Sequence, residues 1–121
     1  MRYLCLVHFE PSIIRDPTFD KSDLDRRSLA YDEELKAAGH YVASEAVLGG
    51  DSAVLVRVRG GKMAATDGPY IETKEQMGGF ILIEARDMND AVRLAAGIPI
   101  AEIGTIEVRP IFEIPTPPPV P

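Results

Sequence analysis

The sequence predicts an α+β fold in which two helices cover an antiparallel sheet. Three observations predict it. Strand-like and helix-like runs follow the order strand, helix, strand cluster, strand, helix, strand; the cluster contains a hairpin signal; and the length suits one domain. A chain of 121 residues buries roughly two-thirds of the surface that its unfolded form exposes. We therefore expect one domain over residues 1–114, followed by a Pro-rich tail over residues 115–121.

The first strand is predicted at the start of the chain. Met1–Phe9 is apolar enough to be a buried strand, and Pro11 stops it because proline has no backbone N–H to donate. Residues 10–21 contain two prolines and two aspartates and are expected to form a loop.

The first helix is predicted between Ser22 and Gly39. Ser22 is the expected N-cap, with Asp25 at the capping-box position, and Gly39 is the expected stop. Apolar positions recur on one side at helical spacing, namely Leu24, Tyr31, Leu35 and Ala38. This pattern is typical of a helix that packs on a sheet.

The strand cluster is predicted to contain a β-hairpin. Tyr41–Leu48 and Ser52–Arg59 are strand-like, and Gly60-Gly61 is a two-residue turn into Lys62–Thr66. Valines alternate along the hairpin with Leu55, Arg57 and Arg59. The hairpin therefore has an apolar face and a mainly basic face.

The second half repeats the strand and helix pattern. Gly79–Ala85 is a clear strand, Asp87 and Asp90 cap a helix that ends by Gly97, and Thr105–Phe112 is the last strand. This order is the ferredoxin-like split βαβ arrangement with an added hairpin. Two helices cover only one face of such a sheet. We therefore expect a homodimer that forms a dimeric α/β barrel, because many apolar side chains are left for the second face: Val54, Val56, Val58, Phe80, Leu82, Ile106 and Val108.

Composition and charge exclude several classes of protein. Apolar residues make up 45% of the chain and charged residues 26%, which is typical of soluble globular domains. No run approaches the ~18 apolar residues of a membrane-spanning helix. The net charge of −6 argues against broad nucleic-acid binding, which needs Lys and Arg on the phosphates. A single Cys5 in an apolar run fits a buried thiol in the cytoplasm, where we expect the protein to reside.

The segment Thr66–Phe80, TDGPYIETKEQMGGF, concentrates ionisable residues between two strands. Asp67-Gly68-Pro69 is a turn signal, and Gly78-Gly79 leads into the next strand with little side-chain bulk. Loops held by a rigid scaffold often carry binding or catalytic groups. The sequence therefore predicts a polar cleft near this DGP turn.

Asp67 and His40 are the candidate catalytic residues. His40 follows the predicted helix stop, where its imidazole would reach a carboxylate such as Asp67 or Glu72 and act in acid–base chemistry at neutral pH. Each also has a structural interpretation. His40 would bond the last helix carbonyls, and Asp67 would accept N–H groups of its own turn. His8, at the end of an apolar strand, is expected to be structural.

Five more residues are candidate ligand-binding groups: Glu72, Lys74, Glu75, Glu107 and Arg109. Glu107 and Arg109 alternate on the last strand, so they share a face and would form a polar pocket with Asp67 and Lys74 if that face is enclosed. The first three residues are also explained by a solvated surface patch. We expect no metal site, because two distant histidines and one cysteine lack zinc spacing, and no cofactor, because no nucleotide-binding fingerprint is present.

Three strings, LKAAGHYVASEAV, TDGPYIETKEQMGGFILIEARDMNDAVRLAAGIP and IEVRPI, resemble the DGPF branch of the YCII-related proteins. The resemblance covers about residues 1–115, with Tyr70 in place of the usual Phe after the DGP turn. It implies a ferredoxin-like subunit in a dimeric α/β barrel, and genes that often lie beside extracytoplasmic-function sigma factors. Some YCII-related enzymes resemble a dehydrochlorinase and use a His–Asp pair with the histidine on the first helix. The first helix predicted here has no histidine, so that role does not transfer.

Three functional hypotheses follow. The first is a cytoplasmic homodimer that binds a small molecule near Asp67 and acts as an acid–base lyase or isomerase. The second is a non-catalytic regulatory or interaction module that works with a sigma factor. The third is a purely architectural motif that braces the dimer.

Overall fold

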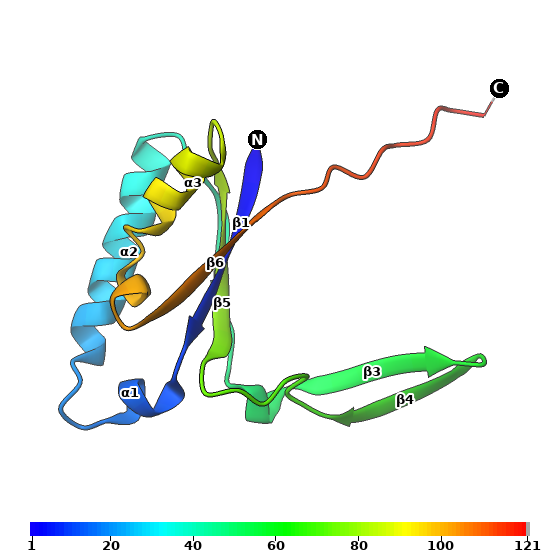
Figure 1. The fold of residues 1–121 in the computed structure, drawn as a ribbon, viewed down its shortest axis with the longest axis horizontal. Coiled ribbons are helices and arrows are strands. Elements are labelled where there is room, and N and C mark those ends of the chain that lie inside the picture. The colour runs from blue at the N-terminus through cyan, green and yellow to red at the C-terminus, as the bar shows by residue number, and fades with distance from the viewer. Residues whose placement is uncertain (121) are drawn as a thin grey trace.

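The computed structural model describes residues 1–120 as a four-stranded antiparallel sheet with helices on one face and a separate two-stranded ribbon (Figure 1). The sheet strands are β1 (Arg2–Phe9), β2 (Tyr41–Ala46), β5 (Gln76–Glu84) and β6 (Gly104–Pro110), and the ribbon strands are β3 (Val54–Arg59) and β4 (Lys62–Asp67). The helices are α1 (Pro11–Arg15), α2 (Lys21–Ala37) and α3 (Met88–Ala95), with 3₁₀ turns η1 (Gly50–Ser52) and η2 (Pro99–Glu102).

The sheet has the strand order β2-β5-β1-β6, and every neighbouring pair is antiparallel. With α2 after β1 and α3 after β5, this is the predicted ferredoxin-like order. The β1–β5 register places Cys5 opposite Ile81 and Tyr3 opposite Ile83. The ferredoxin-like α+β prediction is therefore confirmed for the single chain.

The core lies between the sheet and the two long helices. Alternate β1 residues, Tyr3, Cys5 and Val7, are buried, as are Ile81 and Ile83 of β5. From the helices, the core receives Leu24, Leu35, Ala91, Leu94 and Ala95. Burial raises the pKa of the Cys5 thiol to about 11, so Cys5 is the small buried hydrophobe that the sequence predicts.

Two predictions about the first helical region are corrected. Helix α2 begins at Lys21, and its N-cap is Asp20, whose carboxylate accepts from the Asp23 N–H at 2.9 Å, so Ser22 lies inside the first turn. The stretch predicted as a loop also contains α1, which starts at Pro11 because proline is well tolerated at a first helical position. By contrast, Asp87 caps α3 as predicted and accepts from the Asp90 N–H at 2.8 Å.

The second face of the sheet is open, and of the residues predicted for it only Phe80 and Leu82 lie there. Ile106 and Val108 pack against the helix-covered core, and the three valines belong to the separate ribbon. On the open face these two residues of β5 meet residues of β1 that were not predicted there, with Leu4 opposite Leu82 and Leu6 opposite Phe80. The four side chains are half-buried.

The ribbon forms the predicted two-residue hairpin. Gly60 and Gly61 have φ values of 57° and 75°, the left-handed region that a tight type I′ turn needs at both central residues. None of the ribbon residues is buried. Within residues 1–120, the helices are all too short or too polar to cross a membrane.

Candidate functional site

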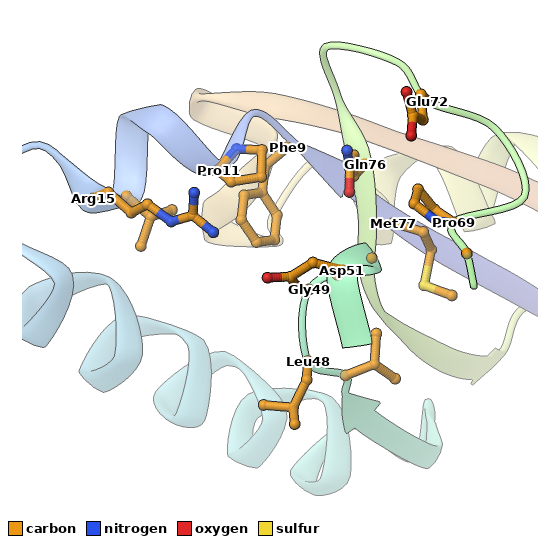
Figure 2. Close-up of a pocket in the computed structure, with 15 residues that line it drawn as sticks. Phe9, Pro11, Arg15, Leu48, Gly49, Asp51, Pro69, Glu72, Gln76 and Met77 are labelled. Carbon is orange, nitrogen blue, oxygen red and sulfur yellow. The ribbon is translucent and has the colours of Figure 1, made fainter. Parts of the chain in front are cut away.

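A cavity of about 510 Å³ lies where β1 ends and β5 begins, beside the DGP turn (Figure 2). Gly68 and Pro69 of the turn line it together with Glu72 and Gln76. The rest of the wall comes from the end of β1, from α1 and from residues 47–51. The DGP segment therefore borders a cavity of the size that holds small organic ligands.

Backbone hydrogen bonds fix the segments around this cavity, here called the DGP cavity. The Gly68 N–H donates to the Ala53 carbonyl at 2.8 Å, which ties the turn to the start of β3. The Val47 N–H donates to the Gly78 carbonyl at 3.0 Å, which ties residues 47–51 to β5. The cavity wall is thus anchored to the ribbon on one side and to the four-stranded sheet on the other.

The DGP cavity combines an apolar surface with a few polar groups. Phe9, Leu48, Pro69 and Met77 supply apolar contacts. The polar groups are Arg15, Asp51, Glu72 and Gln76, and the Arg15 guanidinium lies between Pro11 and Asp51 (Figure 2). Arg15 and Glu72 have no ion pair within residues 1–120. One cation and two carboxylates are therefore available to a ligand.

Asp67 lies just outside the DGP cavity. It is the last residue of β4, opposite Val54, and its neighbour Gly68 lines the wall. Its carboxylate is exposed and accepts no hydrogen bond from the described residues, so the turn-forming interpretation of its side chain has no contact to support it. The carboxylate is accessible to solvent, and the residue next to it in sequence belongs to the cavity wall.

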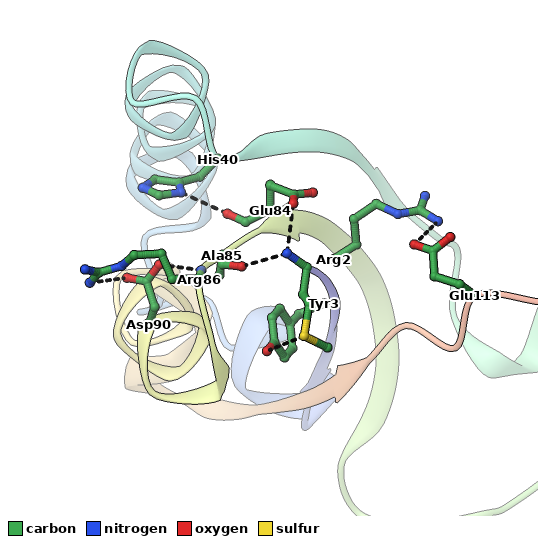
Figure 3. Close-up of polar contacts among 9 residues, drawn as sticks. Arg2, Tyr3, His40, Glu84, Ala85, Arg86, Asp90 and Glu113 are labelled. Atoms are coloured by element: carbon green, nitrogen blue, oxygen red, sulfur yellow. Dashed lines mark hydrogen bonds and ion pairs between the residues drawn. The ribbon is translucent and has the colours of Figure 1, made fainter.

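The structure does not bring His40 to Asp67. The His40 Nδ1 lies 2.9 Å from the carbonyl oxygen of Glu84, at the far end of β5, among contacts that tie the sheet to the helix ends (Figure 3). Strand β5 has nine residues, so its two ends are roughly 26 Å apart. The His40 side chain also bonds a strand carbonyl rather than the helix carbonyls that its structural interpretation named.

Lys74 and Glu75 lie near the DGP cavity without lining it. The Lys74 Nζ is 3.9 Å from a carboxylate oxygen of Glu10. Glu75 accepts from the Thr105 hydroxyl at 2.7 Å, which links the DGP segment to β6. Of the three charged residues predicted in this segment, only Glu72 contributes to the wall.

Glu107 and Arg109 form a cluster with His8 on the open sheet face. The Arg109 Nε donates to Glu107 at 2.6 Å, and the His8 Nε2 lies 3.0 Å from the other carboxylate oxygen of Glu107. The hydrogen bonds from Arg109 and then from His8 hold the pKa of Glu107 below its ordinary value. The predicted shared face is confirmed by this geometry, but its partner is His8 and not Asp67 or Lys74.

A second, smaller cavity of about 140 Å³ lies between α2 and β2. Asp32 and Ser44 line it, with the Ser44 hydroxyl 3.4 Å from the Asp32 carboxylate. Partial burial raises the pKa of Asp32. The two cavities share Gly78 in their walls.

The sequence analysis did not identify Arg15, Asp51 or Asp32, and it did not predict that His8 contacts Glu107. Arg15 was not considered as a site residue because the prolines around it predict a loop. Pro11 directly after a strand is, however, also a signal for the start of a helix. His8 was interpreted through its apolar neighbours, and only the β1–β6 pairing places it beside Glu107. Across residues 1–120, no three His, Cys, Asp or Glu side chains are grouped to hold a metal ion.

Comparisons with known proteins address the fold and the family. The solved structure of 5-chloro-2-hydroxyhydroquinone dehydrochlorinase (TftG) from Burkholderia phenoliruptrix AC1100, in complex with 2,5-dihydroxybenzoquinone, superposes with a TM-score of 0.57 and 18% identity. The match covers 93% of this chain and 94% of that one. At this identity the similarity shows a shared fold.

Sequence comparison also finds the uncharacterised protein R00369 of Rhizobium meliloti (strain 1021), which is 37% identical over 62 residues. The match spans half of this chain and half of that protein. The family model of the YCII-related domain matches residues 1–115, nearly the whole chain. The protein therefore belongs to the YCII-related family.

Proposed function

We propose that the protein binds a small organic molecule in the DGP cavity. The observation that carries this proposal is the composition of the wall, in which apolar side chains are combined with Arg15, Asp51 and Glu72. Binding sites for small molecules typically have 300–1,000 Å³ and a mainly apolar lining with a few polar groups. The DGP cavity, at about 510 Å³, has these properties.

The proposed ligand class is a planar ring that carries ionised oxygens, such as a phenolate or hydroxyquinone. Phe9 and Met77 would contact the ring, and the unpaired Arg15 guanidinium would bind an oxygen anion. The structural neighbour TftG is a dehydrochlorinase of a chlorinated hydroxyhydroquinone and was solved with a hydroxyquinone. The shared fold supports the choice of these compounds as the first probes.

The proposed chemistry is acid–base catalysis of an elimination or isomerisation. Glu72 lies in the wall and is the group best placed to move a proton, while Asp67 at the edge is the second candidate. His40 is not part of this proposal because its imidazole is occupied at the opposite end of β5.

The test is a binding titration of the intact chain with 2,5-dihydroxybenzoquinone and a panel of phenolates, followed by NMR of the backbone amides. Binding should shift the amides of Phe9, Gly49 and Gly78. Arg15→Gln should weaken binding about tenfold or more, because it removes a charge-assisted hydrogen bond. Arg26→Gln is the matched control, since Arg26 pairs with Asp23 on the outer side of α2.

Turnover separates catalysis from binding alone. Glu72→Gln should lower the rate constant by about 100-fold, as expected for loss of a general acid or base, while leaving affinity within about threefold. Glu33→Gln, which removes an exposed carboxylate paired with Lys36, should leave both unchanged. Amide shifts confined to other parts of the molecule would contradict the proposed site.

We also propose the predicted homodimer, in which the open sheet faces of two copies meet. What supports it is the set of half-buried apolar side chains on that face, Leu4, Leu6, Phe80 and Leu82, which no helix covers. The interaction with a sigma factor stays a prediction, for which co-precipitation from cells is the test.

A further inference from the structure

The β3–β4 ribbon is a regular hairpin whose side chains are left accessible by the rest of residues 1–120. Its strands pair over six residues each, from Val54 opposite Asp67 to Arg59 opposite Lys62. None of these residues is buried. A two-stranded hairpin by itself is at best marginally stable in water. The ribbon therefore needs a surface that the rest of residues 1–120 does not provide.

The two faces of the ribbon differ sharply in chemistry. The register puts Val56 opposite Ala65 and Val58 opposite Met63, so one face, here called the valine face, is apolar except where Asp67 lies opposite Val54 at its base. Its members are exposed by 61% (Val54), 64% (Val56), 59% (Val58) and 68% (Met63). The other face carries Arg57, Arg59 and Lys62. Such a contiguous exposed apolar stripe with a charged reverse side is typical of an interaction surface.

The direction of the ribbon indicates which partner it meets. In Figure 1 the helices α2 and α3 lie on one side of the sheet, and the ribbon projects from the end of the sheet toward the other side. It thus extends on the side of the open sheet face. A second copy that covered this face would stand beside the ribbon.

We propose that the ribbon of each copy packs its valine face against the second copy of the chain. This inference rests on the homodimer proposed above and names the segment that each copy exchanges. A strand of six residues spans roughly 20 Å, whereas two packed sheets are about 10 Å apart. The ribbon is therefore long enough to pass the gap between two facing sheets and reach along the partner.

Charge complementarity favours a second copy as the occupant. Arg57, Arg59 and Lys62 form no ion pair among the described residues, and Arg59 donates only to the carbonyl of Val58. The whole chain has a net charge of −6, so the part outside this basic ribbon is more acidic still. The basic face of each ribbon would be attracted to the acidic body of a second copy as the two approach, while the opposite, valine face makes the contact itself.

The test is sedimentation velocity of the full chain over a concentration series. Wild type should dimerise. The double variant Val56→Asp/Val58→Asp should raise the dimer Kd by at least about 100-fold, because it replaces two buried apolar side chains of each ribbon by carboxylates that lose their water in the contact. Leu29→Asp is the matched control, since Leu29 is exposed by 67% on α2. It should leave the Kd unchanged.

Hydrogen exchange gives a second measurement that does not need a variant. Amides of β3 and β4 should be protected at concentrations where the dimer forms and should lose protection on dilution, while β1 and β5 stay protected. A wild type that stays monomeric at 0.5 mM, a concentration well above about micromolar affinities, would overturn both the dimer and the ribbon contact. A dimer whose Kd is the same in the double variant would overturn the ribbon contact alone.

Discussion

The four-stranded sheet and the ribbon both consist of paired antiparallel strands, but only the strands of the sheet contain buried side chains. In the sheet, Ile83 is 1% exposed and Cys5 is fully buried, because α2 and α3 cover one face. In the ribbon, every strand residue remains accessible. Hydrogen bonding is similar in the two regions, so the difference between them is burial. This difference shows that strand pairing defines the shape of a hairpin, whereas burial of its side chains under a second layer stabilises it.

The largest expected effect comes from truncating the core of the sheet. Ile83→Ala should lower the free energy of unfolding by about 3 kcal/mol, because it removes buried methylene groups and leaves a cavity. Val56→Ala in the ribbon should cost under about 0.5 kcal/mol in dilute monomer, since its side chain is already solvated. Urea unfolding of both variants, at a protein concentration below the dimer Kd, makes the measurement. Equal losses would contradict the contrast between the two regions.

The next effect compares glycines in the two regions. A Cβ at Gly104 would lie 2.2 Å from the backbone carbonyl oxygen of His8, so Gly104→Ala must push β6 away from β1 and should cost about 2 kcal/mol or more. A Cβ at Gly61 meets no atom within 4 Å, and Gly61→Ala should cost only the about 1 kcal/mol of a left-handed alanine. Thermal unfolding followed by circular dichroism ranks the two. A larger loss for Gly61→Ala would show that the turn, and not strand approach, limits stability.

Acid pH probes a polar contact that the sheet region has and the ribbon lacks. Asp90 is buried and accepts hydrogen bonds from the Arg86 N–H at 3.0 Å and from Arg93 at 2.7 Å, which hold its pKa well below the ordinary 3.8. Because the lowered pKa favours the ionised form, this stabilisation is present above pH 4 and is lost as the pH falls through the lowered pKa.

Asp90→Asn should therefore be less stable than wild type at pH 7, with a difference that shrinks steadily below pH 4. Unfolding free energies from pH 2 to pH 7 provide the check. Asn89→Ala, at an exposed neighbouring site that does not titrate, is the control and should give a pH-independent difference. A difference between Asp90→Asn and wild type that persists unchanged to pH 2 would rule out an ionised Asp90 as the cause.

The same contrast explains what could be predicted from the sequence. Strands and helices that pack on a core leave local signals, so the apolar run Met1–Phe9 and the Asp87 cap identified their elements correctly. The hairpin itself followed from Gly60-Gly61. Its separation from the sheet did not, because alternating valines predict a half-buried strand without stating which layer covers it.

The site was harder to predict because it is assembled from distant segments. The DGP segment pointed to the right region, and Glu72 lines the cavity there. Arg15 and Asp51 come from stretches without periodicity, and only the fold brings them to the same wall. His40 was predicted to reach Asp67 because it follows the end of a helix. That local position gives no information on the distance of roughly 26 Å between the two ends of β5, and the His40 imidazole lies at the end far from the DGP turn.

The smallest expected effect is that of Asp67→Asn on stability. Asp67 is at the junction of the two regions, its carboxylate is exposed, and no hydrogen bond from residues 1–120 reaches it. The variant should change the free energy of unfolding by less than about 0.5 kcal/mol. If Asp67 acts in proton transfer, turnover of a hydroxyquinone should fall by at least about tenfold in the same variant. If the motif only braces the dimer, turnover should be unchanged and the dimer Kd should rise. Measuring stability, turnover and the dimer Kd on one preparation therefore separates a catalytic Asp67 from an architectural one.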